Sequence, residues 1–124
     1  MLRYLMITRK FETGDTYVLR AKRGETITGG AAVGDAGFGE VRELRPGDVF
    51  RGFAADGIMG GTNMAGGYVT VRHRGAVVLD VKGADVGRPV HAQGPDTFSC
   101  DGKGSVIGWV SNIVSGGAIV KFDA

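Results

Sequence analysis

The sequence of 124 residues has one cysteine, three prolines, two histidines and no long apolar run. A lone Cys100 cannot form an internal disulfide, so the fold does not require an oxidising compartment. No window of about 18 consecutive apolar residues occurs, which excludes a membrane-spanning helix. The segment from Met1 to Phe11 lacks the apolar core and cleavage site of a secretory signal, so we expect it to belong to the mature protein.

Positive and negative residues nearly balance, and reactive groups are not clustered. The formal net charge is only +2 and is spread along the chain, which predicts no direct contact with nucleic acid. His73 and His91 have no cysteine or carboxylate partner at metal-ligand spacing, so we expect no metal and no cofactor. Cys100 is expected to act as a small buried hydrophobe rather than as a nucleophile.

Hydroxyl and carboxyl groups do not form a recognisable catalytic pattern. The serines lie outside any nucleophile-elbow motif, and the aspartates fall at turns and strand ends, where solvated side chains are usual. We therefore predict that the protein is not an enzyme. The residues considered are Ser99, Ser105, Ser111 and Ser115, and Asp80, Asp85, Asp96 and Asp101.

Two glycine-rich stretches invite comparison with phosphate-binding loops, and neither matches. In Gly34–Gly39 (GDAGFG) the glycines are spaced differently from a dinucleotide-binding fingerprint, and no helix pattern follows. In Asp101–Ser105 (DGKGS) the lysine precedes a glycine rather than a serine or threonine. Both stretches are predicted to be turns.

Most of the secondary-structure patterns in the sequence are those of β-strands. Apolar and polar residues alternate in four β-branched or aromatic segments bounded by glycine, and a fifth short apolar run is typical of a strand buried on both faces. Every helix-like stretch of ten residues contains glycine, which disfavours helices. The predicted strands are Thr16–Ala21, Tyr68–Arg72, Ala76–Lys82 and Ala118–Phe122, with Val106–Val110 as the buried one.

Glycine is the residue in excess: the chain has 23, more than twice the usual share of about 7%. Many of them lie where tight hairpins need positive φ. We expect such hairpins at Arg23-Gly24, at Arg74-Gly75 and at Ser115–Gly117.

A weak internal echo suggests a two-part architecture. Tyr17-Val18 followed by Arg23-Gly24 recurs as Tyr68-Val69 followed by Arg74-Gly75, and Ala32–Gly34 is echoed by Asp85–Gly87. Short strands at this spacing predict an all-β fold, a small single-domain β-barrel or β-sandwich of antiparallel strands. We assign residues 11–124 to this domain and residues 1–10 to an N-terminal arm or first strand.

Most aromatic residues occupy positions that alternate like core residues, which argues against a nucleic-acid groove lined with stacked rings. The residues in question are Phe11, Phe38, Phe50, Phe53, Phe98, Trp109 and Phe122.

The order of these turns and strands resembles the glycine-rich capsid decoration, or cement, proteins of tailed bacteriophages. The resemblance covers about four fifths of the chain. The longer N-terminus and the stretch Arg51–Gly67 depart from the family pattern. The segments that carry it are Phe11–Ala21 (FETGDTYVLRA), Thr28–Val41 (TGGAAVGDAGFGEV), Gly67–Val81 (GYVTVRHRGAVVLDV), Val86–Val110 and the closing GGAIVKF.

The resemblance implies a β-tulip-like protein on the outer surface of the phage head. It implies that the protein binds the major capsid protein, bridges neighbouring subunits to stabilise the shell, and self-associates as a homotrimer. The alternative is a head-fibre base or a carbohydrate-binding β module on the virion, for which the available aromatics are Tyr4, Tyr17, Tyr68 and Trp109.

The N-terminal segment and the central loop are the candidate contacts with the shell or with sister copies. Alternation in the arm would let it add as a strand to a sheet edge of the shell protein, or make it the first strand of the domain itself. The methionine-flanked loop Met59–Met64 is the second candidate. The interface candidates are Leu2, Arg3, Tyr4, Met6, Arg9, Met59, Asn63 and Met64.

Overall fold

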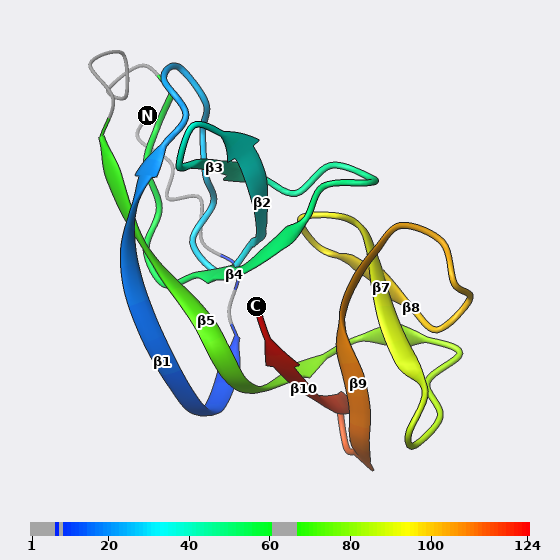
Figure 1. The fold of residues 1–124 in the computed structure, drawn as a ribbon. Coiled ribbons are helices and arrows are strands. Elements are labelled where there is room, and N and C mark those ends of the chain that lie inside the picture. Colours follow the sequence, from blue (N-terminus) through cyan, green and yellow to red (C-terminus); the bar gives the residue numbers. More distant parts are fainter. Residues whose placement is uncertain (1–6, 8, 61–66) are drawn as a thin grey trace, which may run out of the picture.

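The computed structural model describes residue 7 and residues 9–60 and 67–124, and Figure 1 draws its fold. These residues form ten strands and no helix, so the all-β prediction is confirmed. This part of the chain therefore contains no helix that could cross a membrane. The strands are β1 (Lys10–Ala21), β2 (Ala32–Gly37), β3 (Glu40–Glu43), β4 (Phe50–Ala54), β5 (Tyr68–Leu79), β6 (Val81–Lys82), β7 (Pro89–Gly94), β8 (Thr97–Ser99), β9 (Ser105–Val114) and β10 (Gly117–Asp123).

The ten strands form one mixed sheet, and its first five strands close on themselves as a ring. The order is β1-β3-β2-β4-β5, and β1 also pairs along β5 from Lys10 opposite Val78 to Arg20 opposite Tyr68. The β1–β3 pair is parallel, while the other pairs of this ring are antiparallel. Figure 1 places this first ring to the left and at the top.

The remaining strands form a second group beside the first, to the right in Figure 1. Its order is β5-β10-β9-β7-β8-β6, and β6 is separated from β5 by Asp80 alone. Because β6 follows β5 almost directly along the chain, the two ends of this strand order meet and the second group is also closed. Its β6–β8 pair is parallel, as β1–β3 is in the first ring. Strand β5 belongs to both groups and joins them.

The two groups repeat one pattern of strand pairing. Each residue of β7 and β8 lies 57 positions after its equivalent in β2 and β3. Both β2–β4 and β7–β9 have a β-bulge after a valine that pairs with glycine. Both β2–β3 and β7–β8 have a bulge just before the hairpin turn. The equivalent pairs are Val33–Gly52 and Val90–Gly108, Asp35–Val41 and Ala92–Phe98, and Gly37–Glu40 and Gly94–Thr97.

The two-part architecture is therefore present, but the register suggested by the sequence is wrong. Ala32–Gly34 does not correspond to Asp85–Gly87; Thr28–Val33 corresponds to Asp85–Val90. The turn bonds Ala31 N–Thr28 O (3.0 Å) and Arg88 N–Asp85 O (3.1 Å) are equivalent. The bonds Gly30 N–Ala54 O (2.7 Å) and Gly87 N–Val110 O (2.8 Å) are equivalent as well. Short matches of small residues follow turn chemistry and do not define a register.

Two equivalent glycines keep strands close together. A Cβ on Gly52 would overlap the backbone carbonyl of Arg72, and a Cβ on Gly108 would overlap that of Lys121. Arg72 lies on β5 and Lys121 on β10. Glycine is needed at both positions because the neighbouring backbone occupies the space of a side chain.

Two apolar clusters stabilise the fold, one on each side of β4. Phe53 belongs to the larger cluster, which contains residues of both groups. Ala54, the next residue, belongs to the smaller cluster, which consists of first-ring residues and Ile27. Neighbouring strand residues point to opposite faces, so β4 separates the two cores. The ring of Phe53 lies 5.0 Å from that of Phe122 and 5.4 Å from that of Phe50.

The predicted hairpins are confirmed in one place and wrong in two. Ser115–Gly117 joins β9 to β10 as expected. At Arg74-Gly75, however, β5 continues, because Gly75 pairs with Gly14 on one side and with Phe122 on the other. Bonding on both edges keeps the backbone extended. At Arg23-Gly24 the chain turns, with Glu25 N bonded to Lys22 O (3.1 Å), and then enters a loop rather than a paired strand.

Candidate functional site

The histidines and the cysteine, taken first as possible catalytic groups, have structural surroundings. The imidazole of His73 stacks on the ring of Tyr17, with centroids 3.9 Å apart and planes at 12°. His91 is half-buried on β7, opposite Ser99 of β8. Cys100 is half-buried and packs against the larger core.

Asp101 organises the loop between β8 and β9. Its Oδ1 accepts hydrogen bonds from the Ser99 hydroxyl at 2.6 Å and from Lys103 N at 2.9 Å. The hydrogen bond from Ser99 lowers the pKa of Asp101 below its usual 3.8, with a further contribution from Lys103. Ser99 thus directs its hydroxyl hydrogen to a carboxylate that shapes the loop. Within the described residues, no cluster of three or more histidine, cysteine or carboxylate groups is arranged to hold a metal ion.

Ile7 and Arg9, which precede β1, lie at the junction of the two groups. Ile7 N bonds Gly29 O at 2.5 Å, and Arg9 Nε donates to Gly30 O at 3.0 Å. A terminal nitrogen of the Arg9 guanidinium pairs with Asp96 Oδ1 at 2.6 Å. The guanidinium also lies over the rings of Phe98 (5.3 Å) and Phe53 (5.9 Å). Arg9 therefore connects the first ring to the β7–β8 turn.

The structure separates the predicted interface residues. Only 8% of the Arg9 side chain is exposed and its contacts are within the chain, while Met59 is 42% exposed beside the central loop. Their contact with a partner stays a prediction. The other six candidates lie outside the described residues: Leu2, Arg3, Tyr4, Met6, Asn63 and Met64.

An open groove of about 490 Å³ lies between the start of β4 and strand β9. Exposed side chains of Val49, Val106 and Trp109 line it, together with Asp123. The prediction that Val106–Val110 is buried on both faces is therefore wrong. Strand β9 lies at the surface, with Val106 62% and Trp109 46% exposed.

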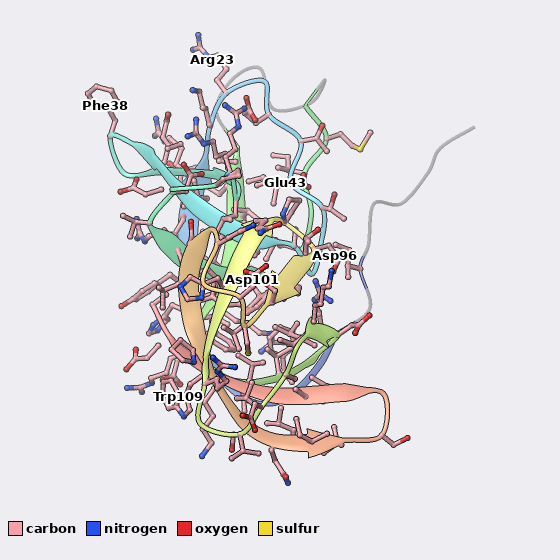
Figure 2. All side chains as sticks on the ribbon, turned by 90° about the vertical axis from the view of Figure 1, so that its right-hand side faces the viewer. Arg23, Phe38, Glu43, Asp96, Asp101 and Trp109 are labelled. Atoms are coloured by element: carbon pink, nitrogen blue, oxygen red, sulfur yellow. The ribbon has the colours of Figure 1, made fainter. Side chains whose placement is uncertain are left out.

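Alternation places Trp109 and Phe38 among the core positions, which is wrong for Trp109 and, most clearly, for Phe38. Phe38 lies at the tip of the β2–β3 hairpin with its ring fully exposed and with a backbone φ of 55°. Figure 2 shows it projecting away from the rest of the molecule. Alternation suggested a core position, but the glycines on both sides of Phe38 were the available signal of a turn.

The aromatic side chains considered for glycan binding lie on different elements. Tyr17 of β1 is stacked on His73 of β5, and Tyr68 is covered on one side by the guanidinium of Arg20 at 5.5 Å. Trp109 lies on β9, in the groove described above. These three rings come from both groups of strands.

Comparisons with protein-family models, with curated proteins and with solved structures found no match to this chain. The function must therefore be argued from the surface and from the sequence motifs.

Proposed function

We propose that this protein is a decoration, or cement, protein that binds the outside of a bacteriophage head and bridges neighbouring subunits of the major capsid protein. The proposal is supported by apolar side chains that are exposed on a framework of two closed groups of strands. Phe38, Val49, Val106 and Trp109 all face solvent, while the polar groups Arg9, Ser99 and Asp101 are used in contacts that hold the fold together. The sequence motifs support the same reading.

Adhesion explains why such a framework is useful. A protein that binds only the assembled shell stabilises that shell by mass action, by about 2.7 kcal/mol per site at a free concentration 100 times the Kd. A bound copy in contact with two subunits must be released before they separate. Stiffness favours such a contact, because little conformational freedom is lost on binding. The chain is proposed to work as a homotrimer, so that one assembly reaches several subunits at once.

The test uses shells assembled from the major capsid protein encoded in the same genome as this chain, without any decoration protein. We expect saturable co-sedimentation of the chain with expanded shells and a higher temperature of shell disruption. Sedimentation velocity of the free chain measures its self-association. Absence of binding at concentrations of about 100 μM, far above a functional Kd, would contradict the proposal.

Deletion of residues 1–6 tests the N-terminal arm. This truncation keeps Ile7 and Arg9, which contact Gly29, Gly30 and Asp96, so we expect the fold to keep its stability. If the arm docks on the shell, affinity falls while the melting temperature is unchanged. Equal affinity would exclude residues 1–6 from the docking surface.

A further inference from the structure

The tip of the β2–β3 hairpin has an unusual backbone. Gly37, Phe38 and Gly39 have φ values of 89°, 55° and 76°, so three consecutive residues are left-handed. For a residue with a large side chain this conformation costs free energy. The Asp35 carboxylate holds the turn by accepting a hydrogen bond from Gly37 N at 2.9 Å. A side chain added at either glycine would meet open space, so nothing within the described chain covers the tip.

The equivalent hairpin of the second group, β7–β8, can be compared with this tip. Pro95 occupies the position of Phe38 in the equivalent β7–β8 hairpin. Its carbonyl oxygen accepts a hydrogen bond from Ala32 N at 2.9 Å, and the next residue, Asp96, pairs with Arg9. The second hairpin therefore docks its tip on the first ring, through one backbone bond and one carboxylate–guanidinium pair. The first hairpin has the same strand register but a different tip backbone, since Gly94, Pro95 and Asp96 lack the positive φ of Gly37–Gly39. Its tip has no such target among the described residues.

We propose that Phe38 is an anchor that inserts into an apolar pocket of the major capsid protein, with basic side chains of that protein facing Asp35 and Glu40. The segment from Gly34 to Val41 carries these two carboxylates and no basic residue. Their charge disfavours an anionic lipid surface and is complementary to arginine or lysine. Aromatic side chains are common among the few residues that dominate binding energy. This inference rests on the proposed function.

The experiment measures the affinity of the full-length chain for decoration-free shells, with Phe38→Ala, Phe38→Leu and Val86→Ala as variants. Val86 is a matched control, because it is an exposed apolar residue (59%) that also lies in a turn. We expect Phe38→Ala to weaken binding about thirtyfold, Phe38→Leu to retain part of the affinity, and Val86→Ala to change it less than twofold. Shell binding that is unaffected by Phe38→Ala overturns the anchor and leaves the proposed function standing. If the unmodified chain does not bind shells, both fail.

A second variant separates docking from a role in folding. Asparagine tolerates the left-handed region, so Phe38→Asn is expected to raise the melting temperature by about 3 °C while weakening shell binding. A lower melting temperature for this variant would make Phe38 a structural residue and overturn the proposal. The proposal is also overturned if Phe38→Ala leaves shell affinity intact but abolishes either self-association or pelleting with phosphatidylserine vesicles.

Discussion

Replacing Arg9 by alanine should destabilise the whole fold, because one side chain links three separate segments. The substitution removes the donor to Gly30 O and the pair with Asp96. It also removes the cation from the rings of Phe98 and Phe53. The side chain is only 8% exposed, so water replaces these contacts poorly.

The magnitude can be worked out from each contact. A hydrogen bond from a charged donor contributes about 1.5–3 kcal/mol. Cation–π contacts add about 0.5–2 kcal/mol, depending on desolvation. The ion pair adds less than about 1 kcal/mol, because the Asp96 side chain is 55% exposed. These contributions are not additive for one side chain, and we expect a loss of about 3 kcal/mol.

Urea unfolding followed by circular dichroism measures this loss, and Asp96→Asn is the matched control. We expect the Arg9→Ala midpoint to fall by about 1–2 M, and Asp96→Asn to cost less than about 1 kcal/mol. Arg9→Lys keeps a positive charge but has no Nε to reach Gly30 O, so its loss should be intermediate. A stability change for Arg9→Ala within about 0.5 kcal/mol would refute the linking role assigned to this residue.

Three further predictions concern packing and charge. Gly108→Ala should destabilise the fold by about 3 kcal/mol or prevent folding, since its Cβ would overlap the backbone of β10. Gly94→Ala, with open space around the added Cβ, should cost less than about 1 kcal/mol. Thermal melting measures both changes. Phe53→Leu should cost about 1–3 kcal/mol in urea unfolding, because this ring contacts four other phenylalanines. Burial opposes ionisation of Asp48, but the hydrogen bonds from the Arg42 side chain and from Arg45 N, together with the charges of these two arginines, outweigh it and hold the pKa of Asp48 below its usual 3.8. The stabilisation that ionised Asp48 contributes is therefore present above pH 3.8 and is lost as pH falls through the lower folded pKa. Asp48→Asn should reduce the change in unfolding free energy measured between about pH 4 and pH 2.

Several features could be predicted from the sequence because they depend on neighbouring residues. Period-two alternation and interspersed glycine determined the all-β class. The Ser115–Gly117 hairpin followed from turn chemistry alone. Even the two-part architecture left a trace, although in the wrong register.

Other features depend on strands that are far apart in the sequence. The continuation of β5 through Gly75 follows from bonding to Gly14 and Phe122 on its two edges. The burial of Arg9 depends on Gly30 and Asp96. None of these partners lies within the local window that a sequence pattern describes.

Phe38 and Pro95 illustrate the division most clearly. The sequence by itself predicted a turn at Gly34–Gly39, which contains Phe38, and it places a glycine directly before Pro95 as well. Only the tertiary structure decided that the Pro95 carbonyl is hydrogen-bonded to the first ring while Phe38 is left in solvent. The physical reason is that local sequence determines the backbone conformation of a hairpin, whereas burial of its tip depends on whether a distant surface is brought against it.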